Sequence, residues 1–429
     1  MSVRSWGNYP KVEHAAVVPL YWRHLELPAA PAPMLPAGLA RSYGDSCLNE
    51  NGTLLATPRL DRLIAFDRST GVIRCEAGMS LAALIALVLP AGWFLPVVPG
   101  TAYVTMGGAI ANDVHGKNHH VAGTFGHHVR RFELLRSDGT RTECVPGDKL
   151  FRATLGGLGL TGLVTWVELQ LVSVPSAFLD VETIRMRDLD HFFALSEASS
   201  ASHEYTVAWV DAMAQGADVG RGTFMRANFA HDAGFAAPRA GRLSIPFDFP
   251  SFALNRPGIA LFNALYRARA QRDWKRTREP CSTYLFPLDG IGHWNRMYGA
   301  RGFLQHQSVV PRTAARENIA RMLEEIARDG EASFLSVLKV FGDRDGPGLL
   351  SFARPGVTLA LDFPMRGPRT LELLDRLDAI VRSAGGAVYP AKDARMSAET
   401  FRTSFPRWQE FRAFIDPSFS SSFWRRVAG

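Results

Sequence analysis

Two glycine-rich segments of this 429-residue chain have the composition of anion-binding loops. Residues 38–45 read GLARSYGD, and residues 99–120 hold glycines at positions 100, 107, 108 and 116. Glycine allows consecutive backbone N–H groups to turn toward one anion, so two such loops could hold a pyrophosphate from both sides. Glycine-rich turns without a ligand would give the same pattern, and the loops alone leave both interpretations open.

Two further motifs have the residue types of familiar binding sites but the wrong surroundings. Residues 157–162, GLGLTG, match GxGxxG, yet residues 163–171 alternate like a strand, whereas the dinucleotide-binding motif needs a following helix.

Several histidines cluster, but Asp113 is the only acidic residue near them, which favours a structural or phosphate-facing role, and we expect no metal site. These histidines are His115, His119, His120, His127 and His128.

The composition is that of a globular protein long enough for two large domains or three small ones: 47% of the residues are hydrophobic and 21% are charged. The net charge of +7 comes from 48 Lys and Arg against 41 Asp and Glu. This excess suits an anionic substrate, a phosphate-bearing cofactor or an acidic membrane surface, but it is too small for a nucleic-acid-binding protein. The four cysteines are far apart, which favours free thiols, and the first residues contain no apolar signal core.

An uncharged stretch, residues 77–112, raises the question of a membrane span. Its apolar part, residues 81–89, is followed by Pro90 and Pro99 and by several glycines, which break a helix well before the roughly 20 residues that a bilayer needs. We therefore expect a buried helix that is capped by Ser80 and followed by turns.

Short apolar runs separated by turns predict strands in the first third of the chain, and longer amphipathic runs predict helices later. Pro175 ends the first part, and we place domain boundaries near this residue and near Gly386. Helices and strands mixed without a strict βαβ rhythm indicate an α+β fold. Strands are expected at residues 54–57, 63–66, 71–75, 131–136, 163–174, 205–210, 304–310 and 334–341, and helices at residues 81–89, 188–199, 313–328 and 370–383.

Residues 247–276 combine aromatic and aliphatic side chains with a basic run of Arg267, Arg269, Arg272, Lys275 and Arg276. The combination suits an interfacial surface that holds a polyprenyl phosphate at a membrane. A loop followed by an amphipathic core helix explains the pattern equally well. Peripheral membrane contact is therefore one of two open interpretations of this segment.

Three segments together resemble one enzyme family: residues 40–45, residues 99–120 and residues 389–395, which read YPAKDAR. They resemble the FAD-dependent oxidases of the vanillyl-alcohol-oxidase type. Within that family the chain is most similar to the oxidase subunits of decaprenylphosphoryl-β-D-ribose 2′-epimerases, over nearly its whole length. Residues 114–120, VHGKNHH, are the most specific part of the resemblance.

The resemblance implies an α+β fold in two parts. A FAD-binding domain of the PCMH type would comprise residues 1–175 together with a C-terminal segment, residues 387–429, that returns to it. Residues 176–386 would form an inserted α+β substrate-binding domain built on an antiparallel sheet. Many relatives attach FAD covalently through His or Cys, but Tyr43 and Asn112 stand at these places here, so the resemblance implies non-covalent FAD.

The resemblance also implies the residues of the site. Catalysis would depend on Lys392 as a cation beside the flavin and the sugar oxygen or phosphate, on His115 to orient the ring or relay a proton, and on Tyr43. The substrate would contact Tyr298, Gln305, Gln307, Lys339 and Lys392. FAD would be bound by Arg41, Ser42, Tyr43, Gly44, Asp45, Gly100, Thr105, Met106, Gly107, Gly108, Asn112, Asp113, Val114, His115, Leu163 and Tyr389.

The implied reaction is the oxidation of the 2′-hydroxyl of a polyprenyl-phosphoryl ribose, the first half of an epimerisation to arabinose for the cell envelope. Alcohol oxidation needs removal of a proton and a donor carbon held near the flavin. The implied partners are the lipid-linked sugar phosphate and a short-chain reductase, without nucleic acid. The implied location is the cytoplasm or the surface of the inner membrane, with no signal peptide or transmembrane helix. An alditol or aldonolactone oxidase and a non-catalytic partner subunit are the alternatives.

Four positions depart from the mycobacterial members of this family. Ala40 stands in place of a glycine, Asn112 and Ala360 stand in place of cysteines, and Thr358 stands in place of an asparagine. These changes are compatible with flavin binding and leave the exact sugar open.

Overall fold

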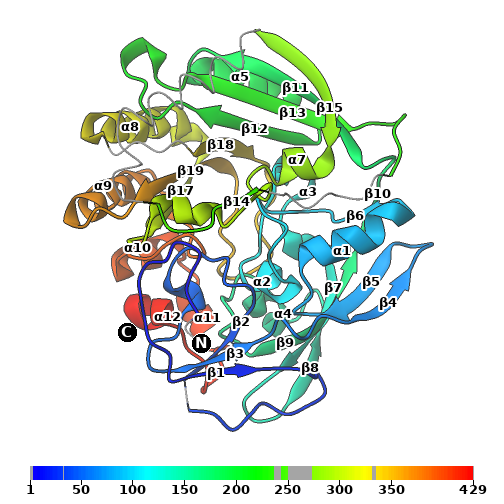
Figure 1. Ribbon diagram of the computed structural model, residues 1–429. Helices are drawn as coiled ribbons and strands as arrows, with labels where there is room; N and C mark the ends of the chain where they lie inside the picture. The colour runs from blue at the N-terminus through cyan, green and yellow to red at the C-terminus, as the bar shows by residue number, and fades with distance from the viewer. Residues whose placement is uncertain (1–2, 32, 236–242, 250–272, 331–334, 429) are drawn as a thin grey trace.

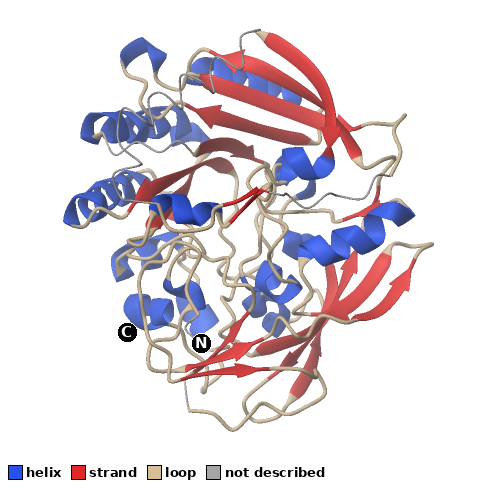
Figure 2. Ribbon diagram, viewed as in Figure 1, coloured by secondary structure: helices blue, strands red, loops and turns tan. Residues whose placement is uncertain are grey.

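The computed structural model describes residues 3–31, 33–235, 243–249, 273–330 and 335–428. Within these ranges the chain mixes helices with mainly antiparallel sheets, as the sequence predicts for an α+β fold (Figures 1 and 2). In the view of Figure 1, a large sheet lies in the upper part of the molecule and the sheets of the N-terminal third lie below it.

The N-terminal third forms a small parallel sheet and a five-stranded antiparallel sheet. Their strands are β1 (Ala16–Pro19), β2 (Met34–Ala37), β3 (Thr53–Ala56), β4 (Leu63–Asp67), β5 (Val72–Glu76), β7 (Val129–Leu135), β8 (Arg141–Cys144) and β9 (Leu163–Gln170). The order is β1-β3-β2 in the parallel sheet and β4-β5-β9-β7-β8 in the antiparallel one. The predicted strands of this part are confirmed, except that the strand expected at 163–174 is divided, since β10 (Val172–Ser173) leaves the sheet to pair with β6 (Trp93–Phe94).

The uncharged stretch contains the short buried helix that the sequence predicts. Helix α1 (Leu81–Val88) begins at Ser80, whose side chain accepts a hydrogen bond from the Ala83 N–H at 3.1 Å. Its apolar side faces the core, and Pro90 ends the regular helix. No helix in the described part of the chain is both long and apolar enough to cross a membrane.

The GLGLTG segment, residues 157–162, follows helix α4 (Lys149–Thr154) and leads into strand β9. A dinucleotide-binding turn lies between a strand and a helix, so this segment is not one, as predicted. The other short helices of the N-terminal third are α2 (Met106–Ala111) and α3 (His119–Ala122), together with the 3₁₀ turns η1 (Asp45–Cys47), η2 (Leu89–Ala91) and η3 (Phe125–His128).

The remaining strands form one antiparallel sheet of order β15-β11-β13-β12-β18-β19-β17-β20. They are β11 (Phe178–Met186), β12 (Tyr205–Val210), β13 (Gly222–Phe229), β15 (Trp274–Pro280), β17 (Phe303–Val310), β18 (Ser336–Phe341), β19 (Gly356–Pro364) and β20 (Ala387–Val388). A two-residue parallel pair, β14 (Leu243–Ser244) with β16 (Ile291–Gly292), lies apart from this sheet. Smaller helical elements are η4 (Gly216–Asp218), α7 (Cys281–Leu285) and η5 (Trp294–Tyr298).

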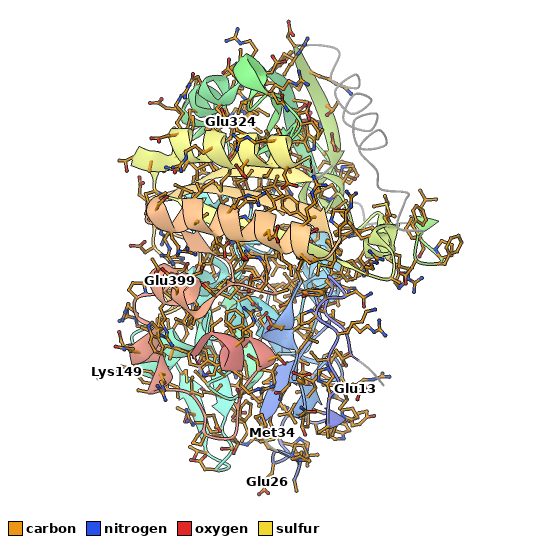
Figure 3. The ribbon with its side chains drawn as sticks, turned by 90° about the vertical axis from the view of Figure 1, so that its left-hand side faces the viewer. Glu13, Glu26, Met34, Lys149, Glu324 and Glu399 are labelled. Atoms are coloured by element: carbon orange, nitrogen blue, oxygen red, sulfur yellow. The ribbon has the colours of Figure 1, made fainter. Side chains whose placement is uncertain are left out.

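Three helices cover one face of the large sheet: α5 (Leu189–Ser199), α8 (Arg312–Asp329) and α9 (Pro368–Ser383). Figure 3 shows α8 and α9 side by side in front of the sheet. Side chains of a strand alternate between its faces, so Leu359 and Leu361 of β19 pack in the cluster that includes these helices, whereas Ala360 faces the opposite way. The other face is thereby free to form a site.

Five strands of this sheet, β11, β13, β15, β19 and β20, were not predicted from the sequence. Strands β11 and β15 carry several charged side chains, which are neutralised across the sheet, as in the pairs Arg226–Glu182 at 2.7 Å and Arg278–Asp180 at 2.8 Å. The predicted basic run reaches this region: Lys275 and Arg276 lie on the edge strand β15, and residues 250–272 lie outside the described ranges.

The C-terminal segment returns to the N-terminal part after β20. Helices α10 (Ala398–Ser404), α11 (Trp408–Arg412) and α12 (Ser422–Ala428) lie beside the first residues of the chain, and the two termini are neighbours in Figure 1. Phe419 forms a bridge with Met34, and the Arg426 guanidinium pairs with Asp45 at 2.7 Å. Because β20 pairs with β17, the return begins at Tyr389.

Candidate active site

A cavity of about 1590 Å³ lies between the uncovered face of the large sheet and the two glycine-rich loops. Sites for one small molecule are usually about 300–1,000 Å³, so this cavity has room for a dinucleotide-sized ligand and a second ligand beside it. Its wall combines the loops at residues 38–47 and 98–117, strands β11 to β19, and the segment from Tyr389 to Lys392.

The first loop, residues 38–43, presents backbone amides to the cavity. Ala40 has a left-handed φ of +50°, a conformation that turns successive N–H groups toward one side of the chain. Within the described ranges, no backbone acceptor is recorded for the amides of residues 39–42. The loop is fixed from behind, where the Tyr43 N–H donates to the Ala391 carbonyl at 2.9 Å.

The second loop touches the first through Thr105. The Thr105 hydroxyl caps α2 by accepting from the Gly108 N–H at 3.1 Å, and a Cβ on Gly38 would lie 2.4 Å from the same oxygen. Glycine at position 38 is therefore required for the two loops to meet. At Gly100 a Cβ would meet nothing within 4 Å, so a ligand has close access to the backbone there.

These loops fit a phosphate-bearing dinucleotide. Free amides in a left-handed turn are suited to an anion, and the buried Ser46 hydroxyl, which lines the cavity, has no hydrogen-bond partner among the described residues. The nearby Cys47 thiol also lines the cavity, but burial raises its pKa to about 12, which keeps it protonated and unreactive at neutral pH.

Lys392 lines the cavity, and its Nζ stands 3.8 Å from the centroid of the Tyr43 ring. Burial lowers the pKa of Lys392, the Asp362 carboxylate opposes that shift, and the Lys339 ammonium adds to it. Burial likewise raises the pKa of Asp362, against its hydrogen bond from Gln305 and the charge of Lys392. Lys392 and Asp362 thus form a buried acid–base pair beside the Tyr43 ring.

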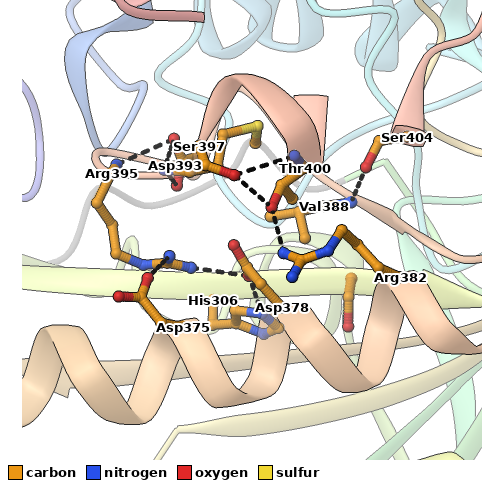
Figure 4. A network of polar contacts seen from close by, with 12 residues as sticks. His306, Asp375, Asp378, Arg382, Val388, Asp393, Arg395, Ser397, Thr400 and Ser404 are labelled. Atoms are coloured by element: carbon orange, nitrogen blue, oxygen red, sulfur yellow. Dashed lines mark hydrogen bonds and ion pairs between the residues drawn. The ribbon is translucent and has the colours of Figure 1, made fainter. Parts of the chain in front are cut away.

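A network of buried charges fixes the segment that carries Lys392 (Figure 4). The Arg395 guanidinium donates to Asp378 of α9 at 2.8 Å, and Asp378 also accepts from His306 Nε2 of β17 at 3.0 Å. The Asp393 carboxylate accepts from the backbone N–H groups of Arg395 and Met396, which closes the turn after Lys392. The network sets the position of Lys392 relative to β17.

His115 approaches the same region from the second loop. Gln307 Nε2 donates to His115 Nε2 at 3.0 Å, so the imidazole proton resides on Nδ1, which is buried and has no partner among the described residues. Burial, with the charges of Lys339 and other nearby cations, holds the pKa of His115 well below its usual range. His115 is therefore a neutral imidazole whose buried Nδ1–H is left without a partner among the described residues.

Further cations line the cavity. Burial lowers the pKa of Lys339 to about 8 and that of Lys117 to about 7. Lys117 Nζ donates to the Leu285 carbonyl at 2.7 Å, and the Arg41 guanidinium stacks 4.2 Å from the centroid of the Trp6 ring. No salt bridge is recorded for Arg41, Lys117 or Lys339 within the part of the chain that the structure describes. Basic side chains thus outnumber the two acidic ones that line the cavity, Glu279 and Asp289.

The structure brings most of the residues predicted for the site to this cavity. The residues that line it are Arg41, Ser42, Tyr43, Gly100, Thr105, Gly107, Gly108, Asn112, Val114, His115, Leu163, Gln305, Gln307, Lys339, Tyr389 and Lys392. Five others do not line it: Gly44, Asp45, Met106, Asp113 and Tyr298.

Those five residues support the wall from behind. Asp45 pairs with Arg426, and Gly44 packs so closely on the C-terminal segment that a Cβ would lie 1.7 Å from the Asp393 carbonyl oxygen. The Asp113 carboxylate accepts from the Ser351 hydroxyl and the Gly126 N–H. Met106 is fully buried, and Tyr298 stacks on Phe303 with centroids 4.2 Å apart.

Sequence reasoning missed several charged residues at the site, among them Lys117, Asp289 and Asp362. Lys117 lies within the specific VHGKNHH string, so the string itself was a signal. Asp289 accepts from the Ala102 N–H at 2.7 Å, and Asp362 lies opposite Gln305 in the pairing of β17 with β19. Nothing in the local sequence marks these two acids, because their partners come from distant strands and loops.

The clustered histidines bond to the protein itself. His120 Nε2 lies 2.9 Å from the His203 carbonyl oxygen, and His128 Nε2 lies 2.9 Å from the Ala122 carbonyl oxygen. No group of three His, Cys, Asp or Glu side chains in the described ranges is arranged to hold a metal ion.

Comparison with known proteins identifies the family. The FAD binding domain family matches residues 26–145, which include both glycine-rich loops. Decaprenylphosphoryl-β-D-ribose oxidase of Mycolicibacterium smegmatis is 37% identical over 410 residues, or 91% of this chain and 88% of that protein. The chain belongs to the decaprenylphosphoryl-β-D-ribose oxidase family. As a member of this family it is an FAD-dependent oxidoreductase.

Two other relatives show how far the likeness to this oxidase family extends. An uncharacterized protein in the mprA 5′ region of Streptomyces coelicolor is 36% identical over 370 residues, or 81% of this chain and 100% of that protein. Alditol oxidase of a Streptomyces species is 27% identical over 145 residues, only 31% of this chain and 35% of that protein. Membership of the oxidase family therefore rests on similarity over 91% of this chain, whereas the likeness to alditol oxidase covers 31% of it.

Proposed function

We propose that this oxidoreductase converts the 2′-hydroxyl of a polyprenyl-phosphoryl ribose into a ketone, the first half of an epimerisation to arabinose. The observation that carries the proposal is the 37% identity, over 410 residues, with a relative named for oxidation of decaprenylphosphoryl ribose. FAD, when bound, accepts the hydride that leaves C2′. The chain must then hold the sugar and take up the hydroxyl proton.

Lys392 is the residue that we assign to the 2′-oxygen. Because burial lowers its pKa, its nitrogen can accept the hydroxyl proton as an amine or stabilise negative charge on the oxygen as an ammonium. Asp362 supports the charged form, and the Tyr43 ring holds the side chain at 3.8 Å. The Lys392 nitrogen is thus the atom that we assign both to proton removal and to charge stabilisation.

The sugar is assigned to the polar side chains that surround Lys392. His115 lines the cavity and is held by its hydrogen bond with Gln307 at 3.0 Å. Gln305 and Gln307, two residues apart on β17, face the cavity together. Tyr298 is assigned an indirect role, since its hydroxyl reaches Asp362 at 3.4 Å and it does not line the cavity.

The charge of the cavity supports a phosphorylated substrate over a neutral polyol. Lys339 lines the wall on β18 and Lys117 lines it on the second loop, without a recorded salt bridge within the described ranges. These cations would attract the phosphate of an anionic substrate as well as the phosphates of FAD. We assign the phosphate of the substrate to Lys339, which stands on the same sheet face as Gln307.

We also propose the two-part division of the chain. Residues 1–175 and the segment from residue 387 onward would form the FAD-binding domain, and residues 176–386 would form the substrate-binding domain. The separate sheets before and after Pro175, and the return of α10 to α12 to the N-terminal segment, support the division. The two parts are firmly joined, since one hydrophobic cluster contains Phe132 as well as Leu179.

A short-chain reductase is the partner that the reaction calls for, because the 2′-ketone must be reduced from the opposite face to give arabinose. We propose such a partner subunit and peripheral contact with the inner membrane, where a polyprenyl substrate resides. The exposed Trp274 and the cations Lys275 and Arg276 on edge strand β15 support the membrane contact.

Anaerobic reduction of the flavin tests the proposed function. We expect the yellow colour of the purified protein to bleach with polyprenyl-phosphoryl ribose and to remain with free polyols and aldonolactones. Bleaching by free polyols instead would favour an alditol oxidase, and a protein that cannot take up FAD would favour a non-catalytic subunit. In Lys392→Met, we expect bleaching by the ribose substrate to slow by at least about 100-fold.

A further inference from the structure

The cavity continues beyond the polar site along the uncovered face of the large sheet. Directly opposed residues form a row across its strands: Gln307 of β17 faces Ala360 of β19, and Ala360 faces Val337 of β18. Val337 in turn faces Trp209 of β12, and all four side chains line the cavity. The row leads away from the His115–Gln307 hydrogen bond toward the far strands.

A second row completes this groove at its outer end. Val207 of β12 faces Met225 of β13, Met225 faces Thr183 of β11, and Thr183 faces Lys275 of edge strand β15. These residues also line the cavity. Neighbouring strands are about 4.8 Å apart, so the five steps from β17 to β11 span roughly 24 Å.

The side chains change character along this distance. Polar groups surround Gln307, aliphatic and aromatic side chains line the middle of the groove, and the exposed Lys275 lies at its end. Val207 and Trp209 are buried and line the cavity, so the middle of the groove has an apolar wall inside the protein. A free sugar would bind poorly against such a wall, because its hydroxyl groups would be buried without hydrogen-bond partners.

We propose that this groove, from Ala360 to Thr183, holds the first isoprenoid units of the substrate and leads the rest of the chain out at β15. The proposal rests on the proposed function and adds the place of the lipid tail. The phosphate then lies near Lys339, which is two residues from Val337 on the same face of β18. The tail leaves beside Trp274, which is exposed at the start of β15.

A series of ribosyl phosphates with one to ten isoprenoid units tests the groove in the FAD-loaded protein. Each added unit buries several methylene or methyl groups, so we expect KM to fall about tenfold or more per unit until the groove is full and then to level off. A KM that does not depend on chain length would overturn the proposal. Failure of every substrate to reduce the flavin would instead overturn the proposed function.

Variants that narrow the groove give the second test. In Thr183→Trp and Met225→Trp we expect the ratio of kcat/KM between long-chain and short-chain substrates to fall at least tenfold. Thr313→Trp, on the exposed side of α8, is the matched control and should leave the ratio unchanged. Bound FAD, measured in each variant, reports whether the fold is retained. An unchanged ratio in both FAD-loaded groove variants would contradict the proposal.

Discussion

The buried carboxylate of Asp378 should hold together the segment that carries Lys392, and replacing it by asparagine tests this. Asp378 accepts from Arg395 at 2.8 Å and from His306 at 3.0 Å, and its side chain is only 2% exposed (Figure 4). In Asp378→Asn the shape is kept, but the guanidinium of Arg395, itself 9% exposed, loses its buried counter-charge.

The expected loss of stability follows from that burial. Removing one partner of a buried ion pair costs about 3–5 kcal/mol, because the remaining charge is left in the interior. Asp375 provides a matched control, since it pairs with the same guanidinium at 2.7 Å but is 69% exposed. Asp375→Asn should therefore cost at most about 1 kcal/mol. The difference between the two variants is thus expected to be roughly 2–5 kcal/mol.

Denaturant unfolding of both FAD-saturated variants measures this difference. His306 lies between Gln305 and Gln307 on β17, so Asp378→Asn should also lower kcat with the ribose substrate, whereas Asp375→Asn should not. Equal unfolding free energies for the two variants, or a loss under about 1 kcal/mol in Asp378→Asn, would refute the assignment of Asp378 as the central carboxylate of the network.

Three further predictions concern the loops and the cofactor. In Gly44→Ala a Cβ would lie 1.7 Å from the carbonyl oxygen of Asp393, the neighbour of Lys392, so kcat of the FAD-loaded enzyme should fall about 100-fold. Gly234→Ala is the control: a Cβ at Gly234 would meet nothing within 4 Å, so kcat should be unchanged. After FAD is removed, the free energy of unfolding should rise with pH above about 7, because Lys117 has lost its proton in the folded protein but keeps it in the unfolded chain. Lys117→Met should reduce the slope of this rise by up to about 1.4 kcal/mol per pH unit. Acid precipitation should release all FAD into the supernatant, and colour retained in the protein pellet would contradict non-covalent binding.

The elements with strong local signals were predictable from the sequence. Ser80 caps the helix that follows it, and the helices at 313–328 and 370–383 show amphipathic periodicity, so their own residues determine them. The two glycine-rich loops were recognisable for the same reason, since glycine marks places where the backbone turns tightly. Lys392 was found through its motif, which is also a short local string.

Strands β11 and β15 were missed because charged side chains hide their alternation. Their charges are stabilised by partners across the sheet, such as Glu182 with Arg226, and the sequence does not reveal that pairing. The buried acid Asp362 was missed on the same grounds, because its contact with Gln305 exists only in the register of β17 with β19.

The sequence by itself thus determined which residues can turn, cap and alternate, and which motif carries the lysine of the site. Only the tertiary structure decided that Tyr43 and Lys392, almost the whole chain apart, lie 3.8 Å from ring to ammonium. It also decided that Lys392, Lys339 and Lys117 have lowered pKa values, because burial penalises a charge only once distant segments have closed around it. Local conformation depends on neighbours in the chain, whereas electrostatics and cavity shape depend on neighbours in space.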